Sequence, residues 1–388
     1  MVLAHLLHSL PEHYAKPVMA IHINHGLHPE ADSWQSHCAA FCLDLGVSFI
    51  AEGVQVSNTG KGLEAAARDQ RYAALSRHLN SDDALFTAHH QQDQAETVLL
   101  NLFRGAGVDG LAGMPIQKKL EQAVHVRPLL NISKTEIQSY AAHHQLTWVS
   151  DPSNQDTVFT RNYIRESLLP NLRQRWQEVD TVLSRTAQNM GQAAVLLKDL
   201  AVLDFATTVD NEQRLKLETF KELSVARQHN LLRYWLGQHQ LIPSSAQIDA
   251  VLNQCIGAAE DATPAVELGE YVIRRYRDRL YLLLQTDSAP VQPCTWDLKE
   301  NLELSELGLS LEPEWLLSRY AELSDEDRVQ IRFRQGGEKF KADKQGLKKS
   351  LKHYFQETGV PPWERDRIPL IYQNDELIAV WGISHSNH

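Results

Sequence analysis

Cysteine and long apolar runs are both scarce in this chain of 388 residues. Only two of its four cysteines are close together, Cys38 and Cys42, and their spacing is neither a CxxC metal or redox motif nor a disulfide framework. No apolar run approaches the roughly 18 residues that cross a membrane, and the first residues lack the basic flank of a signal peptide. We therefore expect buried free thiols, no membrane association and a cytoplasmic location.

Repeats and low-complexity tracts are also absent from the sequence. A hydrophobic content of 43% with 22% charged residues is typical of a globular protein. At roughly 150 residues per domain, the length predicts two or three domains. The net charge of −11 argues against indiscriminate nucleic-acid binding. A local basic face stays compatible with it, because charges act within about a Debye length.

Strand and helix patterns alternate through the first hundred residues. Apolar runs predict strands near residues 18–23, 47–52 and 84–87, and periodic apolar positions predict helices at 2–10, 31–45 and 62–72. Strands alternating with helices of this length imply right-handed crossovers. The predicted fold class is therefore α/β, with an N-terminal doubly wound parallel sheet.

The stretch from Thr87 to Thr97 holds two adjacent histidines, a carboxylate and a Glu-Thr pair between two apolar runs. It has the pattern of a strand, a turn and a helix. Ligands of open parallel sheets bind at such junctions, outside the carboxyl ends of the strands. The plainer interpretation is a helix cap with solvated histidines.

Two further segments are rich in residues that bind ligands. Residues 104–114 contain four glycines, which suits a loop wrapped around a ligand or a flexible surface loop. Asp, Asn and Arg are concentrated in residues 151–165 beyond what a linker needs. Between these segments, Ser133 and Glu136 have the spacing of a capping box at a helix start.

The second half of the chain predicts a long helix over residues 168–209, helices over 225–239 and 245–255, and a hairpin over 265–276. Residues 288–293 have linker composition, and a mixed region of strands and helices follows. Residues 328–367 carry eleven Lys or Arg against five acids, with aromatic residues interleaved. Cations and stackable rings suit single-stranded or loop RNA, although a solvated basic face would have the same composition.

Several of these motifs occur together in an order that identifies a family. They are Ile21-His22-Ile23-Asn24-His25-Gly26-Leu27, Gly62-Leu63-Glu64-Ala65-Ala66-Ala67-Arg68, Thr87 to Thr97, Arg104-Gly105, Arg127-Pro128-Leu129-Leu130, and Asp151-Pro152-Ser153-Asn154 with Arg161-Asn162. In this order the chain closely resembles the bacterial tRNA(Ile)-lysidine synthetases, enzymes of the PP-loop ATP pyrophosphatase superfamily. The resemblance covers nearly the whole chain, including Gly336-Gly337-Glu338 and Gly359-Val360-Pro361-Pro362-Trp363.

The resemblance implies three domains: a PP-loop ligase domain over residues 1–185, a mostly helical tRNA-recognition domain over 200–287, and a small α+β tRNA-binding domain over 294–388. It implies ATP-dependent ligation of free L-lysine to C2 of the wobble cytidine in a tRNA(Ile) with a CAU anticodon. In the family, ATP adenylates the cytosine C2 oxygen, and the lysine amine then displaces AMP. The cofactors implied are ATP and Mg²⁺, and a homodimer is left open.

The resemblance also assigns residues to roles. Asp93 and Arg161 match the family's catalytic carboxylate and arginine, with Asp93 also placed to contact Mg²⁺. The expected lining of the ATP and lysine pocket is His25, Gly26, His90, Glu96, Arg104 and Gly105. The expected tRNA-binding residues are Arg68, Arg274, Arg275, Lys348, Lys349 and Lys352.

The chain departs from the family in one important respect. The family opens with a strand and a Ser-Gly-Gly-x-Asp-Ser loop that cradles the ATP pyrophosphate, and these 388 residues contain no such motif. Met1 to Leu7 resembles the helix after that loop. We expect either a start further upstream or an inactive copy, and favour the former because the remaining motifs are intact. Gln92 stands where the family often has Asp, and the chain stops soon after Gly382.

Three alternatives stay open at this point. The chain could be a catalytically impaired, tRNA-binding fragment of such an enzyme. It could be a related PP-loop tRNA-thiolation enzyme, although Cys38 and Cys42 on a helix match that chemistry poorly. A metal site formed by His22, His25 and His28 rests only on spacing, and Gly26 breaks any helix that would align them.

Overall fold

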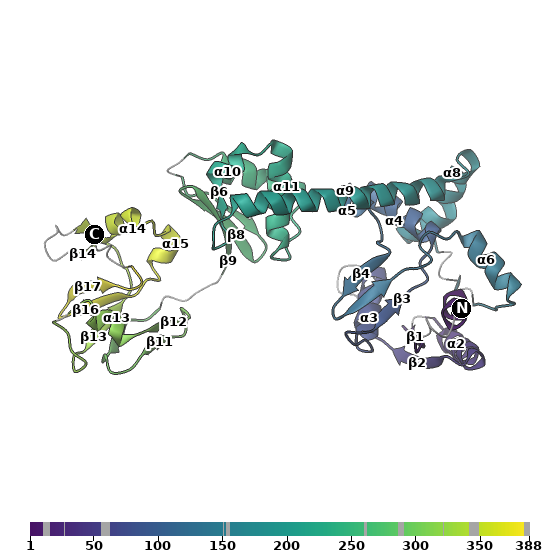
Figure 1. The fold of residues 1–388 in the computed structure, drawn as a ribbon, viewed down its shortest axis with the longest axis horizontal. Coiled ribbons are helices and arrows are strands. Elements are labelled where there is room, and N and C mark those ends of the chain that lie inside the picture. Colours follow the sequence, from purple (N-terminus) through teal and green to yellow (C-terminus); the bar gives the residue numbers. More distant parts are fainter. Residues whose placement is uncertain are drawn as a thin grey trace. The chain divides into compact units, whose positions relative to one another are not determined.

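A computed structural model describes residues 1–10, 16–26, 28–55, 63–149, 151–152, 156–259, 262–285, 291–320, 322–340 and 349–383. The chain forms two compact units, unit 1 over residues 1–201 and unit 2 over 202–388 (Figure 1). None of the helices in the described ranges is long and apolar enough to cross a membrane. All four cysteines are free, as predicted; Cys42 and Cys255 are buried, and Cys38 and Cys294 are partly buried.

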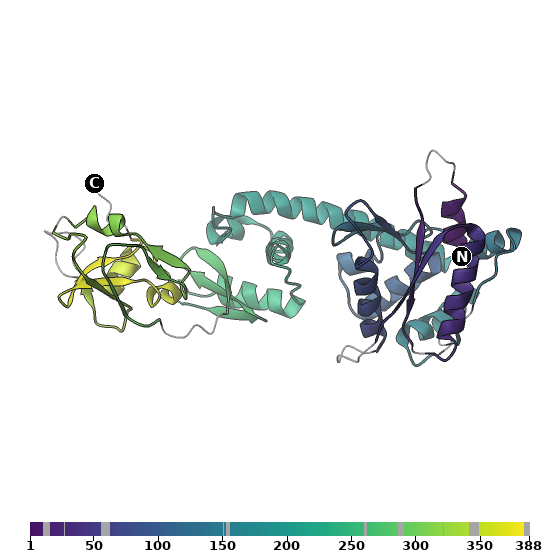
Figure 2. The same ribbon diagram turned by 90° about the horizontal axis from the view of Figure 1, so that it is seen from below.

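Unit 1 begins with alternating helices and strands. They are α1 (Val2–His8), β1 (Met19–Asn24), α2 (Ala31–Leu45), β2 (Ser48–Gly53), α3 (Leu63–Ser76), β3 (Ala84–Phe86) and α4 (Gln91–Phe103). β1 and β2 pair in parallel, with Met19 opposite Ser48. α2 and α3 lie on opposite sides of this pair (Figures 1 and 2). The predicted α/β class and the predicted order of elements are confirmed.

A second sheet in unit 1 has the order β3-β5-β4. β5 (Ala123–Val126) pairs in parallel with β3, whereas β4 (Gln117–Leu120) pairs with β5 in antiparallel fashion. The β4–β5 hairpin was not predicted, because β4 reads Gln-Lys-Lys-Leu and carries no apolar alternation. The short helix α5 (Val108–Leu111) precedes it, and α6 (Lys134–His143) follows. The predicted capping box starts α6: the Glu136 amide donates to Ser133 Oγ at 3.2 Å, and the Ser133 amide donates to the Glu136 carboxylate at 2.9 Å.

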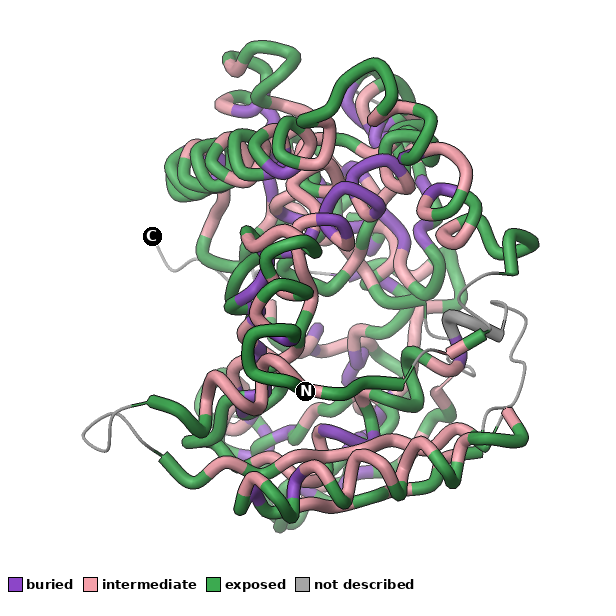
Figure 3. Tube along the Cα trace, turned by 90° about the vertical axis from the view of Figure 1, so that its right-hand side faces the viewer, coloured by how far each residue is buried: buried purple, intermediate pink, exposed green. Residues whose placement is uncertain are grey.

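The rest of unit 1 is helical, with α7 (Thr160–Tyr163), a π-helical turn η2 (Ile164–Leu168), α8 (Leu169–Arg175) and the 30-residue α9 (Val179–Thr208), which continues into unit 2. The prediction of one helix over 168–209 is wrong, because the chain leaves helical conformation at Trp176. The break has a packing reason. Residues before it (Ile164, Leu169) and after it (Val179, Leu183) join one apolar cluster with Ala95 and Leu99 of α4, which one straight helix could not supply. Figure 3 shows buried positions (purple) alternating with exposed ones (green) along the helical segments.

In the described residues, unit 2 contains two four-stranded sheets and two two-stranded ones. The first has the order β6-β9-β8-β7, from β6 (Leu215–Lys216), β7 (Ala265–Leu268), β8 (Tyr271–Tyr276) and β9 (Arg279–Leu284). It packs with α10 (Leu217–Glu222), α11 (Val225–Gly237), α12 (Ser245–Ala250) and the π-helical turn η3 (Val251–Ile256) around a core that includes Phe220 and Trp235. The predicted hairpin and both predicted helices are confirmed.

The second sheet of unit 2 is antiparallel, with the order β10-β13-β16-β17. Its strands are β10 (Cys294–Trp296), β13 (Val329–Arg332), β16 (Leu370–Gln373) and β17 (Glu376–Val380). Around it lie β11 (Leu302–Leu304), β12 (Leu309–Leu311), α13 (Pro313–Leu317), β14 (Lys339–Phe340), β15 (Lys349–Ser350), α14 (Leu351–Glu357) and α15 (Pro362–Arg365). This sheet has its own core around Trp296, Ile331 and Ile371.

Candidate active site

The start of α4 fixes the position of Asp93. His90 occupies the N-cap position in extended conformation, and its backbone N–H donates to Asp93 Oδ2 at 3.0 Å. A carboxylate in the first turn also interacts favourably with the helix dipole. Thr97 adds a hydrogen bond to the Asp93 carbonyl at 2.8 Å. The junction predicted from the sequence is therefore a helix cap, and the same cap orients Asp93 toward the neighbouring helical run.

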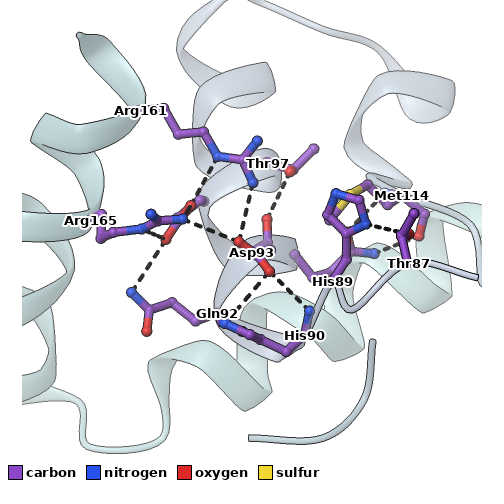
Figure 4. A network of polar contacts seen from close by, with 11 residues as sticks. Thr87, His89, His90, Gln92, Asp93, Thr97, Met114, Arg161 and Arg165 are labelled. Atoms are coloured by element: carbon purple, nitrogen blue, oxygen red, sulfur yellow. Dashed lines mark hydrogen bonds and ion pairs between the residues drawn. The ribbon is translucent and has the colours of Figure 1, made fainter. Parts of the chain in front are cut away.

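Two arginines from that run meet two carboxylates of α4. Arg161 Nε donates to Glu96 Oε2 at 3.0 Å, and Arg165 Nε donates to Glu96 Oε1 at 2.7 Å. Both guanidinium groups also reach Asp93 Oδ1, at 3.4 Å from Arg161 Nη2 and 3.2 Å from Arg165 Nη2. Figure 4 shows both arginines converging on Asp93. We call Asp93, Glu96, Arg161 and Arg165 the carboxylate–guanidinium cluster.

The cluster is electrically balanced and unevenly exposed. The Glu96 side chain is fully buried, whereas Arg161, Arg165 and Asp93 keep 23%, 22% and 14% of their side-chain surface in contact with solvent. Hydrogen bonding to Glu96 raises the pKa of Arg165. The buried Gln92 donates to Glu96 Oε1 at 3.3 Å. Glu96 thus holds both arginines from a buried position, and Asp93, Arg161 and Arg165 each keep part of their side-chain surface exposed.

His25 and His90 each present a buried ring nitrogen. The Nδ1 atoms of both rings have no hydrogen-bond partner in the described part of the chain. Burial lowers the pKa of both residues, so each ring is neutral near pH 7. His90 adjoins Asp93, whereas His25 follows β1 and its Nε2 lies 3.3 Å from Arg71 of α3. Gly26 turns the chain here with φ of +62° and donates to Asn24 Oδ1 at 2.9 Å.

Arg104 and Gly105 lie at the opposite end of α4 from Asp93. Arg104 is the exposed C-cap residue, and Gly105 continues with φ of +70°. With a rise of about 1.5 Å per residue, the helix separates Arg104 from Asp93 by roughly 16 Å. The structure therefore does not bring these two residues into the carboxylate–guanidinium cluster, and their role as pocket residues stays a prediction.

The residues predicted to bind tRNA fall into different environments. Arg68 is exposed with its guanidinium over the Tyr72 ring, and the half-buried Arg274 has its guanidinium 5.7 Å from the centre of the Trp363 ring. Lys349 and Lys352 are exposed, and Lys349 pairs with Glu357 at 2.8 Å. Lys348 lies outside the described residues.

Arg275 needs a correction. Its side chain is 5% exposed, and its guanidinium donates to the carbonyls of Ala258 at 2.8 Å and Arg277 at 3.1 Å. A buried cation that satisfies backbone carbonyls is not available to a phosphate. Arg274 and Arg275 are successive residues of a strand and therefore face opposite sides. The sequence alone could not show which of the two sides is buried.

The Mg²⁺ contact predicted for Asp93 stays a prediction, because a contact through a single carboxylate needs no cluster of protein ligands. Within the described ranges, no group of three or more His, Cys, Asp or Glu residues could hold a metal ion. Both oxygens of Asp93 already accept hydrogen bonds, from His90 on one side and the two arginines on the other. His22, His25 and His28 form no such group either.

Sequence analysis missed Arg165 as a functional residue. Its spacing of four from Arg161 places both side chains on one helical face, and this was the available signal. His89, in the same junction, was also left without a role. Its Nδ1 lies 2.7 Å from the Thr87 hydroxyl, which is also 2.8 Å from His125 Nε2.

The parallel strands, the polar junction at β3 and the carboxylate–guanidinium cluster define an α/β enzyme domain of the PP-loop class. The PP-loop domain family matches residues 1–172, and PP-loop domains bind ATP. Two further family models match, the TilS substrate binding domain over residues 215–281 and the TilS substrate C-terminal domain over 329–388.

Two relatives are similar over almost the whole chain. The tRNA(Ile)-lysidine synthase of Coxiella burnetii is 38% identical over 385 residues, which cover 98% of this chain and 86% of the relative. That of Legionella pneumophila strain Paris is 37% identical over 399 residues, with coverages of 100% and 89%. The chain belongs to the tRNA(Ile)-lysidine synthase family.

A solved structure, the U34-tRNA thiolase NcsA from Methanococcus maripaludis with its [4Fe-4S] cluster, is more distant. It is 18% identical and has a TM-score of 0.41, covering 49% of this chain and 67% of that chain. At this level of similarity it carries no argument about the site.

Proposed function

We propose that this protein ligates free L-lysine to the wobble cytidine of a tRNA(Ile) with a CAU anticodon, using ATP. The observation that carries the proposal is the carboxylate–guanidinium cluster at the start of α4, within a PP-loop domain of this family. A carboxylate beside two guanidinium groups suits a reaction in which an attacking amine gives up a proton and negative charge develops on a phosphate.

The chemistry has two steps. The cytosine C2 oxygen attacks the α-phosphate of ATP, and pyrophosphate leaves. The lysine amine then attacks C2, the bond between C2 and oxygen breaks, and AMP leaves with that oxygen. The amine loses a proton as the new carbon–nitrogen bond forms, and the proposal assigns that proton to the Asp93 carboxylate.

Arg161 is the residue proposed to hold the developing negative charge on the phosphate. Its guanidinium is already oriented by Glu96 at 3.0 Å, so little reorganisation is needed when a phosphate oxygen arrives. Because Arg71 donates to His25 Nε2, the neutral His25 ring carries its proton on Nδ1, and we assign this N–H as a donor to ATP or lysine. The Nδ1 atom of His90 also lacks a hydrogen-bond partner among the described residues. Mg²⁺ and its contact with Asp93 stay predictions from the family.

The three predicted regions divide the work in this proposal. Residues 1–185 carry the chemistry, and residues 200–287 and 294–388 hold the tRNA. The exposed cations Lys349 and Lys352 and the half-buried Arg274 supply phosphate contacts in unit 2, and Arg68 supplies one in unit 1. The homodimer left open by the resemblance adds nothing to the site as described.

The test of catalysis is AMP release that depends on both lysine and tRNA. Asp93→Asn removes the charge at the cluster and should reduce AMP release by about 100-fold or more, as expected for loss of a general base. Asp44→Asn, at an exposed position of α2 in the same unit, is the matched control and should retain activity. Full activity of the Asp93 variant would remove this carboxylate from the mechanism.

A second measurement separates turnover from binding. Lys349→Glu with Lys352→Glu should weaken tRNA binding and reduce the dependence of the affinity on salt concentration, because fewer counterions are released. Reversal of the exposed Lys198 is the control. Repeating the AMP assay with the family's glycine-rich loop placed before Met1 distinguishes a ligase from a chain that binds tRNA without turnover.

A further inference from the structure

A chain of buried hydrogen bonds ends at His89, beside the proposed site. Arg127 Nη2 lies 3.1 Å from His125 Nδ1, and His125 Nε2 lies 2.8 Å from Thr87 Oγ1. The same Thr87 oxygen lies 2.7 Å from His89 Nδ1. His125 and Arg127 are 2% and 4% exposed, so water cannot replace these partners. The chain therefore joins the interior of the β3-β5-β4 sheet to the junction before α4.

The direction of every hydrogen bond in this chain follows from Arg127. A guanidinium can only donate, so His125 Nδ1 must accept. A neutral His125 then carries its proton on Nε2 and donates it to the Thr87 oxygen. Among the described residues, His89 Nδ1 is the only acceptor beside the Thr87 hydroxyl, so the single Thr87 proton is satisfied when it is donated to His89 Nδ1. His89 is left with an unprotonated Nδ1 and a proton on Nε2, the ring nitrogen that takes no part in this series of hydrogen bonds.

The environment keeps both histidines neutral. Burial, together with the charge of Arg127, lowers the pKa of His125 to about 4. Burial also lowers the pKa of His89 to about 4, against the opposing charge of Asp93. The charge of Arg161 acts on His89 as well, which places its ring within the field of the cluster. His89 Nε2 has no hydrogen-bond partner among the described residues, and Figure 4 shows the His89 ring with its bond to Thr87.

We propose that Arg127, His125 and Thr87 are positioning residues that fix His89 as a neutral Nε2–H donor to a substrate oxygen. The assignment of a substrate rests on the proposed function, whereas the tautomer of His89 does not. The oxygen belongs to a phosphate of ATP or to the carboxylate of lysine, since both are anionic acceptors. A neutral donor suits this place because it binds an anion without taking the proton that the attacking amine must release to Asp93.

The direct test is nitrogen NMR of the protein labelled with ¹⁵N-histidine, with the His89 signals assigned by their loss in His89→Gln. At pH 7 the unliganded protein should show a protonated Nε2 and a bare Nδ1 for His89. A proton on Nδ1, or an imidazolium, overturns the proposal. Thr87→Val, which keeps the shape but removes the hydroxyl, should change the Nδ1 signal. Thr87→Ser should preserve it, and thermal unfolding of both variants checks that they are folded.

Ligand titrations in the same spectra identify the substrate oxygen. A shift of the Nε2 signal on adding ATP alone assigns it to a phosphate, and a shift on adding lysine alone assigns it to the carboxylate. No shift with either ligand overturns the substrate contact, whether or not the protein turns over. In the AMP assay, Thr87→Val should lower kcat/KM about fivefold, the factor expected for one hydrogen bond, with Thr87→Ser close to the parent. An active Thr87→Val protein with unchanged kcat/KM would also contradict the proposal that the hydrogen bonds from Arg127 to His89 position His89.

Discussion

Replacing Glu96 with glutamine removes one negative charge from a fully buried position and keeps the size of the side chain. The carboxylate–guanidinium cluster then changes from balanced charges to an excess of one positive charge. Breaking a buried ion pair on one side costs about 3–5 kcal/mol. Arg161 and Arg165 keep 23% and 22% of their side chains exposed and retain Asp93 as a partner, so we expect about 2–3 kcal/mol.

The measurement is thermal and urea unfolding of the whole protein, followed through the transition of unit 1. For a region of this size, 2–3 kcal/mol corresponds to a decrease in Tm of roughly 4–12 °C. The matched control is Asp180→Asn. Asp180 also pairs with an arginine of the same unit, Arg173 at 2.7 Å, but it keeps 21% of its side chain exposed. The control should therefore lose less than about 1 kcal/mol. Equal losses in the two variants would refute the assignment of Glu96 as a buried anchor.

Three further predictions concern stability. The pKa of His125 lies at about 4 in the folded protein, below its ordinary 6.5, so its contribution to stability is complete above pH 6.5 and lost as the pH falls toward 4. Unit 1 should lose about 2 kcal/mol between pH 7 and pH 5 through this residue, and urea unfolding of His125→Gln should show a correspondingly smaller loss. Gly113→Ala should lower the free energy of unfolding of unit 1 by about 2 kcal/mol, because φ is +64° and the new Cβ would lie 2.7 Å from Gln94 Oε1. The control is Gly105→Ala, where φ is +70° but the space is open. Calorimetry should show a smaller loss of stability for this control. Arg275→Met should lower the urea midpoint of unit 2 by the equivalent of about 2 kcal/mol, because Arg275 is buried. Arg274→Met should have a smaller effect, because Arg274 is only half-buried. Equal losses in the two variants would contradict this difference in burial.

Local patterns predicted much of the fold because they are written in neighbouring residues. The alternating strands and helices up to α4 follow from the spacing of apolar residues. The capping box at Ser133 follows from a four-residue pattern. The β4–β5 hairpin could not be predicted, since its stability comes from pairing with β3 rather than from its own composition. The break at Trp176 likewise results from packing on α4. It could not be predicted, because the packing partners lie far away in the sequence.

The site was predictable to the extent that its residues belong to motifs. Asp93 and Arg161, both named from the resemblance, lie together in the structure at 3.4 Å. Arg165 and His89 were missed because their importance depends on partners 60 or more residues away or on a buried chain of hydrogen bonds. The metal contact of Asp93 stays a prediction. Sequence identifies the carboxylate, and the structure adds that both of its oxygens accept hydrogen bonds.

Asp93 also has a second duty, because the carboxylate proposed for the chemistry is the one that caps α4 through the His90 amide at 3.0 Å. A change at this residue therefore lowers the folded fraction of the protein as well as its turnover. In a cell, such a variant would be cleared by proteases faster than one altered at an exposed catalytic group. A mutational scan that measures only protein abundance should therefore show lower abundance for substitutions at Asp93, although protein abundance does not report on catalysis.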